Sequence, residues 1–252
     1  MFSRGWMLQE LVAPHTMWFY DFQWQSVGSK HGLQSKLSRI TRIPPDIHLH
    51  EAPLSSVLVT QRLSWAAGRE TTRVEDQAYC LLGIFDVNMP LLYREESKAF
   101  RRLQQEIIKS STDLSIFAWT VSHLHADNMG YNQKHYCGIL AVSPALFKSS
   151  GPLLRSISGQ RQKGFSVTNK GLKTGSLVVS RPFAEPNFTH LLSLSCRDED
   201  GLDRAVRLQM VSQNTYVRCN PFRLSFYDDR SVHGETGDCY VLVGNPPAAM
   251  GA

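Results

Sequence analysis

The sequence predicts an α+β protein, in which an α/β segment and a helical connecting segment precede a β-rich antiparallel module. Up to about residue 110, apolar residues recur at helical spacing. Beyond residue 111, the apolar segments become short, rich in β-branched and aromatic residues, and separated by turn-forming residues. The chain has 252 residues, 42% hydrophobic and 19% charged. A chain of this size and composition can bury a core.

Residues 1–53 are expected to mix helix and strand. A first helix is predicted by the spacing of Leu8, Leu11 and Val12, and it should stop at Pro14. The aromatic segment 15–22 then has the composition of a strand. A second helix is predicted over residues 28–43, with Ser29 as its N-cap. Its apolar face would carry Leu33, Leu37 and Ile40.

Residues 54–110 are expected to form three helices that pack on one another. The first covers residues 54–67 and closes at Gly68. The second begins at a T-x-x-E capping box made by Thr72 and Glu75, and it ends at residues 88–90. Its apolar stripe consists of Ala78, Leu81, Leu82 and Phe85.

The third helix of this segment is expected to begin near Glu95 and Glu96. It would turn Phe100, Leu103 and Ile107 toward the core. Burial of one such side chain stabilises a fold by about 1.5–3 kcal/mol. These three helices should therefore dominate the local stability.

Residues 111–252 are expected to form an antiparallel sandwich or barrel-like module. The predicted strands are short and are divided by Gly, Pro, Asn and Asp. They lie at residues 114–121, 135–142, 164–169, 171–180, 190–198, 205–211, 215–220 and 238–244.

Composition excludes several classes of function. The net charge of +5 is spread along the chain without a basic run, so nucleic acid is not an expected partner. Five separated cysteines without a CxxC pair indicate buried, reduced thiols. The N-terminal residues do not resemble a signal peptide, and no run of eighteen apolar residues predicts a membrane span. A cytoplasmic protein is expected.

Metal binding and familiar catalytic motifs are not predicted. His48 and His50, and likewise His123 and His125, form H-x-H pairs that could present two imidazoles on one face of a strand. No third ligand stands at a telling spacing, so we expect solvated loop histidines and no metal site. The sequence has no phosphate-binding glycine loop and no nucleophile elbow.

A polar and aromatic patch on the first helix is a candidate binding site. It consists of Arg4, Trp6, Gln9 and Glu10, of which the last three share a helix face. A carboxylate beside an indole could contact a ribose. The alternative, which we favour, is that Trp6 packs and that the polar groups bond to a neighbouring loop.

A second charged cluster lies around the turn before the second connecting helix. It comprises Arg69, Thr72, Arg73, Glu75 and Asp76. The cluster could be a binding surface between two helices. We favour a structural network, because Arg guanidinium groups bind carboxylates with two parallel hydrogen bonds.

Three segments resemble fungal heterokaryon-incompatibility (HET) proteins. The segment RGWMLQELVAP, from Arg4 to Pro14, resembles the C-terminal part of the HET domain. Residues 62–119 are similar to the signature that follows this domain in many of these proteins. Residues 164–173 resemble a later element of the same module, a domain of unknown function. The resemblance divides the chain into residues 1–53, 54–110 and 111–252.

The resemblance implies a role in non-self recognition and regulated cell death, exerted through protein partners. It also implies that residue 1 falls inside the HET domain, so that residues 1–53 are a truncated α/β remnant. The domain is similar to TIR-type domains, some of which cleave NAD, and Glu10 would then be the catalytic carboxylate. An NAD-consuming enzyme and a non-functional fragment are therefore the alternatives. Without the missing half, we expect neither activity nor a bound cofactor.

One departure from the family pattern concerns Arg94 and Glu96. Relatives usually carry glycine at both positions, in a Tyr-Gly-Glu-Gly segment. A loop that needs positive φ at these residues would therefore be strained or rebuilt in this chain.

Overall fold

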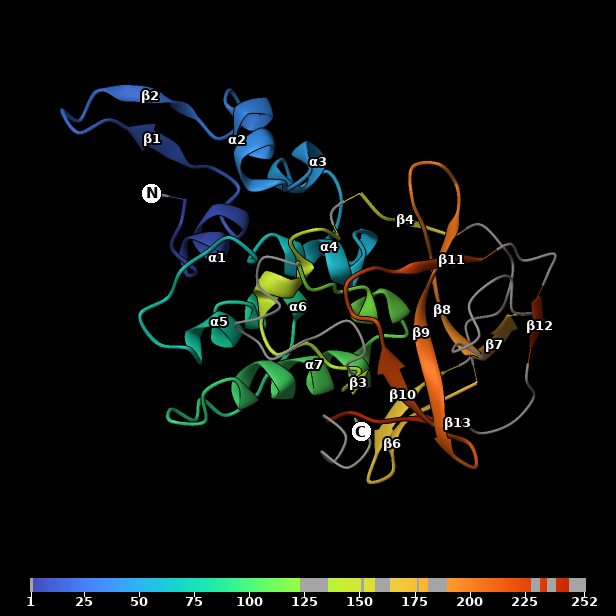
Figure 1. Cartoon of the computed structure of the whole chain (residues 1–252). Coiled ribbons are helices and arrows are strands. Elements are labelled where there is room, and N and C mark those ends of the chain that lie inside the picture. The colour runs from blue at the N-terminus through green and yellow to red at the C-terminus, as the bar shows by residue number, and fades with distance from the viewer. Residues whose placement is uncertain are drawn as a thin grey trace.

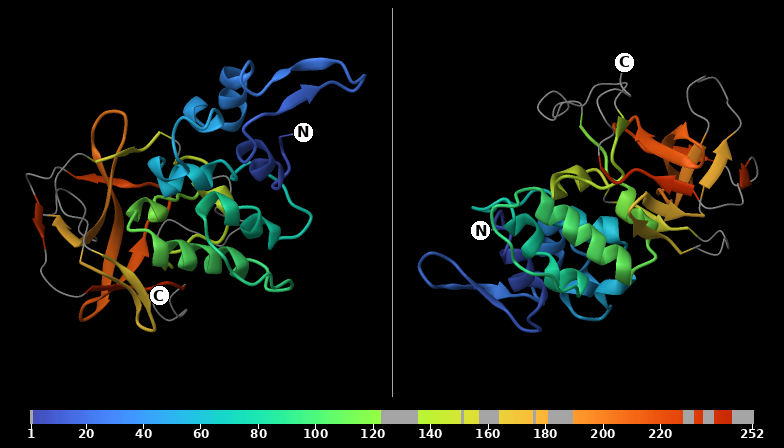
Figure 2. Two further views of the ribbon diagram at one scale, coloured as in Figure 1. Left: turned by 180° about the vertical axis from the view of Figure 1, so that it is seen from behind. Right: turned by 90° about the horizontal axis from the view of Figure 1, so that it is seen from below.

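The computed structural model describes residues 2–122, 136–150, 152–156, 164–175, 177–180, 190–227, 232–234 and 239–244. The described chain is α+β, as predicted, with its helices in the first half and its strands mainly in the second (Figure 1). The helices and the large sheet form two adjoining layers (Figure 2).

The first part of the chain forms a helix, a two-stranded hairpin and two further helices. These are α1 (Met7–Val12), β1 (Trp18–Tyr20), β2 (Ser26–Ser29), α2 (Gln34–Thr41) and α3 (Pro45–His48). Helix α1 buries Leu8, Leu11 and Val12, which confirms the predicted stripe. The hairpin projects from the end of the molecule opposite the sheet (Figure 1).

Two details of the second predicted helix were wrong. Ser29 is not its N-cap, because this residue ends strand β2 and its hydroxyl accepts a hydrogen bond from the backbone N–H of Gly32. Helix α2 begins later, after Leu33. Leu37 is buried, but Ile40 is 56% exposed. The hairpin and the turn after it occupy residues that periodicity alone assigned to a longer helix.

The connecting segment contains one regular helix and several short ones. The elements are η1 (Leu54–Ser56), α4 (Val59–Ser64), α5 (Asp76–Tyr79), α6 (Leu82–Phe85) and α7 (Lys98–Ser110). Helix α7 buries Phe100, Leu103 and Ile107, as predicted.

The predicted second helix of this segment is broken into α5 and α6. Residues Ala78 to Leu81 are all buried, so this stretch has no solvent-facing side. Cys80 and Leu81 separate the two helices, and Leu81, with φ −106° and ψ −9°, departs from ideal helical dihedral angles. The predicted capping box is also wrong. Glu75 is itself the residue before α5, makes no side-chain cap bond there, and accepts from another loop instead.

Within the described residues, eleven strands form one sheet. The short strands are β3 (Tyr136–Cys137), β4 (Leu154–Arg155), β5 (Ser166–Thr168), β6 (Gly171–Thr174), β7 (Leu177–Ser180), β11 (Ser225–Tyr227), β12 (Val232–Gly234) and β13 (Cys239–Val241). The longer strands are β8 (His190–Arg197), β9 (Asp203–Ser212) and β10 (Thr215–Cys219). The main order is β12-β7-β8-β9-β10-β13-β6-β5, and β4, β11 and β3 pair with β8, β9 and β10.

The sheet is mixed and not wholly antiparallel, which corrects one part of the predicted fold class. Strand β13 runs parallel to β10 and antiparallel to β6. It lies between these two strands, which run in opposite directions. It can therefore be antiparallel to only one of them.

The helical layer and the sheet share one hydrophobic core. A single cluster of buried residues extends from Leu8 in α1 to Val241 in β13. Arg218 of β10 joins the two layers, because its guanidinium donates to the carbonyls of Phe117 and Trp119 and lies 3.7 Å from the Trp119 ring centroid. The division into three domains remains a prediction, and the described part of the chain packs continuously across its boundaries.

Polar side chains distant in sequence cap the connecting helices. Asp113 accepts from the N–H of Val59, and Ser115 accepts from the N–H of Thr60, at the start of α4. The two backbone N–H groups at the start of α4 are thereby hydrogen-bonded to side chains more than fifty residues away.

A buried side-chain amide also links distant segments. The amide of Gln104 donates to the carbonyl of Ala141 and accepts from its N–H.

Candidate functional site

The patch predicted on α1 is only partly assembled. Trp6 is 40% exposed, and Arg4 and Glu10 are also exposed. The side chain of Gln9 is half-buried and lies against Gly83. The four side chains therefore have different surroundings and do not form one pocket. Trp6 is less buried than expected, and the structural role of the patch stays a prediction.

The backbone before α1 is fixed to the turn after α4. Gly5 donates to the carbonyl of Glu70 at 2.9 Å, and Glu70 donates to the carbonyl of Ser3 at 2.6 Å. A Cβ atom on Gly5 would lie 2.6 Å from Thr71 Cγ2, which is closer than real Cβ contacts. The closeness of the two segments thus requires glycine at position 5. Sequence spacing alone contained no signal for this contact.

The side chains of the charged cluster around residues 69–76 contact other groups of the protein, and their partners differ from those predicted. Arg69 donates to two backbone carbonyls, those of Trp65 and Arg4. The guanidinium of Arg73 lies 4.6 Å from the Tyr93 ring centroid, and Asp76 accepts from the Tyr93 hydroxyl. Thr72 is exposed. The network therefore relies on carbonyls and an aromatic ring where Arg–carboxylate pairs had been predicted.

Glu75 holds the loop formed by residues 90–97, which we name the anchored loop. Its carboxylate accepts from the backbone N–H of Arg94 at 2.6 Å and of Glu96 at 3.1 Å. Hydrogen bonds from its own N–H and from those of Glu96 and Arg94, together with the charge of Arg73, lower the pKa of Glu75. Both Arg94 (φ 74°) and Glu96 (φ 51°) have positive φ, so the loop needs at these two residues the conformation that glycine adopts most readily.

Tyr79 anchors the same loop from α5. Its hydroxyl lies 2.6 Å from the Leu92 carbonyl and 3.1 Å from a Glu95 carboxylate oxygen, and it accepts from the Leu92 N–H at 2.7 Å. Arg102 of α7 donates to Glu95 and to the carbonyl of Pro90. Burial, and the bond to Glu95, raise the pKa of Tyr79. The anchored loop is thus bonded to both neighbouring helices.

The hairpin of residues 18–29, which we name the aromatic hairpin, exposes four large aromatic side chains. Their exposed fractions are 56% for Trp18, 52% for Tyr20, 90% for Phe22 and 83% for Trp24. Phe19 points the other way and packs against the core. Asp21 closes the turn, because its carboxylate accepts from the N–H groups of Gln23 and Gln25. The rings of Tyr20 and Trp24 lie 6.3 Å apart between centroids. Exposed aromatic side chains grouped on one hairpin are a feature of interaction sites.

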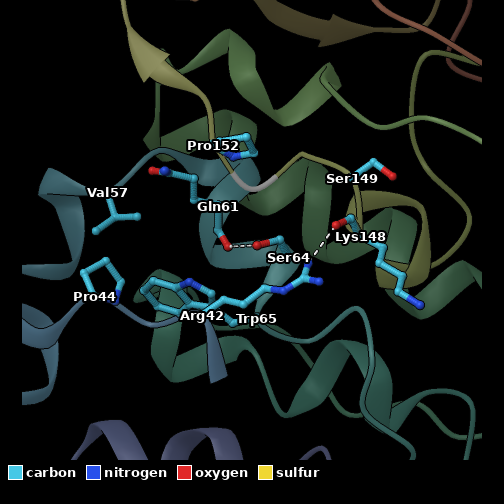
Figure 3. A pocket seen from close by; sticks show the side chains of 9 residues that line it. All are labelled: Arg42, Pro44, Val57, Gln61, Ser64, Trp65, Lys148, Ser149 and Pro152. Carbon is cyan, nitrogen blue, oxygen red and sulfur yellow. Dashed lines mark hydrogen bonds between the residues drawn. The ribbon is translucent and has the colours of Figure 1, made fainter. Parts of the chain in front are cut away.

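Two neighbouring cavities lie where α2, α4 and the segment after η4 (Pro144–Phe147) meet; together we name them the Arg42 groove. The larger cavity has a volume of about 470 Å³ and the smaller one about 200 Å³. Both are lined by Arg42, Ser64, Trp65 and Lys148. The Arg42 side chain extends across the larger cavity, and its guanidinium donates to the carbonyl of Lys148 at 2.8 Å (Figure 3). Glu10 lines neither cavity. The alternative of an NAD-cleaving site at Glu10 stays a prediction.

Of the two H-x-H pairs, the structure describes His48 and His50. His48 is buried beside Thr41, whereas His50 stacks on His15 at 4.0 Å between ring centroids. The imidazoles therefore point to different neighbours. Burial, with the charge of Lys30, lowers the pKa of His48 to about 4. His123 and His125 lie outside the described residues. The described residues contain no group of three His, Cys, Asp or Glu side chains placed to hold a metal ion.

All five cysteines are buried and unpaired, as predicted. Burial raises the pKa of Cys80 to about 12 and that of Cys137 to about 11. Thiols with such values are poor nucleophiles near neutral pH. Among the described helices, none has the length and apolar character needed to cross a bilayer.

Comparison with known proteins relates the chain to fungal incompatibility proteins. Residues 98–153, which include α7 and part of the Arg42 groove, match a family described as a domain of unknown function, DUF8212. Over 146 residues the chain is 37% identical to the vegetative incompatibility protein HET-E-1 of Podospora anserina. The alignment covers 56% of this chain and 11% of that protein, so the chain corresponds to a small part of its relative. No solved structure matches the chain.

Proposed function

We propose that this chain acts in fungal non-self recognition, as an interaction module of a vegetative incompatibility system linked to regulated cell death. The similarity to HET-E-1 carries the proposal, because 37% identity over 146 residues is high for a chance match. The name of that protein assigns it to vegetative incompatibility. Because only 11% of its length is matched, the proposal concerns recognition and not the activities of its other parts.

The aromatic hairpin supports contact with a protein. Trp, Tyr and Phe are enriched in protein interfaces, since each contributes a large rigid surface. Asp21 is the one charged residue between positions 18 and 29. Sites that stack nucleic-acid bases combine aromatic side chains with cations, and membrane-surface segments are usually basic. The lack of positive charge thus favours a protein partner.

The test is expression of the chain in a filamentous fungus, with growth and cell death as the readout. We expect the unaltered chain to change the incompatibility response. The double variant Trp18→Ser/Trp24→Ser should abolish this effect, while its thermal stability and abundance stay unchanged. The matched control is Phe226→Ser, which removes an aromatic side chain that is 65% exposed on β11, away from the hairpin.

Two results would count against the proposal. In the first, the unaltered chain causes no change in growth or heterokaryon formation in any tester strain. In the second, Phe226→Ser and the hairpin variant lose the effect equally, which would indicate a general response to surface change and not recognition by the hairpin.

A further inference from the structure

We propose that the Arg42 groove binds a small organic anion, whose phosphate or carboxylate head group lies at the cationic end and whose apolar remainder fills the larger cavity. The proposal goes beyond the function proposed above and does not depend on it. It rests on the charge, the shape and the division of the groove into a polar and an apolar end.

The residues that line the groove carry positive charge without a compensating carboxylate. Arg42 and Lys148 line both cavities, and Arg69 lines the smaller one. No Asp or Glu is among the lining residues of either cavity. The ion pairs found in the described residues also leave Arg42 and Lys148 unpaired. A concave surface with cations alone produces a positive potential that attracts anions.

Arg42 is held across the groove at a cost in backbone energy. It ends α2 with φ 63°, a left-handed conformation that glycine or asparagine adopts more readily. Its own N–H bonds to the carbonyl of Ser38, which fixes the start of the side chain. Its guanidinium is fixed by the carbonyl of Lys148. Strained positions that persist in a fold often serve binding sites, and a guanidinium is the side chain best suited to grip an oxyanion with paired hydrogen bonds.

The larger cavity is amphipathic along its length. Pro44 and Val57 lie at one end, whereas the Arg42 guanidinium, Lys148 and Ser149 lie toward the other (Figure 3). Trp65 and Pro152 add further apolar lining. Its volume of about 470 Å³ falls within the range of small-molecule sites, about 300–1,000 Å³. Such a cavity suits a ligand with one anionic end and one apolar end better than it suits a bare inorganic ion.

Calorimetric titration of the whole chain at constant ionic strength tests the proposal. The probes are inorganic phosphate, phenyl phosphate and benzoate. Phenyl phosphate should bind about tenfold more tightly than inorganic phosphate, because its ring buries apolar surface in the cavity. Comparison of phenyl phosphate with benzoate then identifies the preferred head group. Binding of either one supports the site. Failure of all three to bind would overturn the proposal.

Single substitutions test whether the anion binds in the Arg42 groove. Arg42→Gln should weaken phenyl phosphate binding about tenfold, since it removes a charge-assisted contact. Lys148→Gln should have a smaller effect, about twofold to threefold, because the ammonium is exposed. Arg39→Gln, which removes an equal charge from an exposed position on the same helix outside both cavities, should have none.

Arg42→Gly keeps the test valid if Arg42→Gln fails to fold. Glycine relieves the left-handed strain at this position, so this variant should retain its melting temperature and lose the same affinity. Equal weakening by Arg39→Gln and Arg42→Gly would show that net charge and not the groove attracts the anion, and would overturn the proposal. Tight binding of an acidic peptide with no binding of phenyl phosphate or benzoate would do the same.

Discussion

The anchored loop and the aromatic hairpin both expose apolar side chains, yet their backbones are held in opposite ways. The anchored loop exposes Leu91, Leu92 and Tyr93, but its backbone is bonded to Glu75, Tyr79 and Arg102 of the neighbouring helices. The hairpin exposes larger side chains, and its projecting part is held by its own strand pairing and by Asp21. Exposed apolar side chains therefore lie on a backbone that is bonded to neighbouring elements in the anchored loop, and on a backbone that is held mainly by its own contacts in the aromatic hairpin.

The difference assigns distinct roles to the two regions. Substitutions that affect the anchored loop should change the free energy of unfolding, because the loop is held by hydrogen bonds to neighbouring elements, most of them partly buried. Substitutions in the hairpin should change recognition and leave folding nearly unaltered. Four measurements can refute or refine this distinction.

The largest expected effect is that of Tyr79→Phe. The change leaves the N–H and the carbonyl of Leu92 without their shared hydroxyl partner. We expect a loss of about 1–3 kcal/mol in the free energy of unfolding, measured by urea denaturation. Tyr93→Phe is the matched control, because its hydroxyl makes an exposed bond to Asp76 and should contribute much less. Equal losses in both variants would show that the loop is not anchored through Tyr79.

The second effect depends on pH and on Glu75. Its folded pKa is lowered from 4.5, so the carboxylate contributes stability above pH 4.5 that is lost as the pH falls through the folded pKa. The melting temperature of the unaltered chain should thus fall more between pH 6 and pH 3 than that of Glu75→Gln. Glu10→Gln, at an exposed carboxylate of α1, should follow the unaltered chain. Parallel curves for all three proteins would contradict the role of Glu75.

A gain in stability is expected for Arg94→Gly, and likewise for Glu96→Gly. Both residues have positive φ, and glycine adopts this conformation without steric cost. The bonds to Glu75 involve the backbone and are retained. Each variant should gain about 0.5–1 kcal/mol, after allowance for the greater entropy of unfolded glycine. Arg101→Gly in the middle of α7 should lose about 1 kcal/mol. A loss in Arg94→Gly would mean that its side chain holds the loop.

The smallest effect on stability is expected in the hairpin. Trp24→Ser and Phe22→Ser should each change the free energy of unfolding by less than about 0.5 kcal/mol, because these side chains are almost fully exposed. Chemical denaturation measures this directly. A loss above about 2 kcal/mol in either variant would indicate that the hairpin stabilises the fold, and the distinction between the two regions would fail.

Several features of the fold could be predicted because they depend on local pattern. Helices α1 and α7 each have one buried face, and their apolar spacing identified the buried residues. The prediction of strain at positions 94 and 96 rested on the glycines of relatives, and both residues have positive φ. The described strands β5, β8 and β10 lie within predicted segments, since composition and turn residues mark them.

Other features were missed because their partners are distant in sequence. The break between α5 and α6 lies at Cys80 and Leu81, inside the predicted apolar stripe, where helical spacing gives no sign of it. The carboxylate of Glu75 accepts hydrogen bonds from backbone N–H groups about twenty residues away. Its spacing from Thr72 had instead indicated a helix-capping role. The larger cavity of the Arg42 groove combines residues from positions 42 to 152, none of which was predicted as a site residue.

Local spacing and residue type were sufficient to establish the α+β class, the amphipathic faces of the regular helices and the reduced state of the cysteines. These properties depend on neighbours within a turn or two, or on composition. Tertiary packing alone decided the direction of β13, the partners of the charged cluster, the exposure of the aromatic hairpin and the existence of the groove. Each of these is a relation between segments that the chain brings together only when its shared core forms.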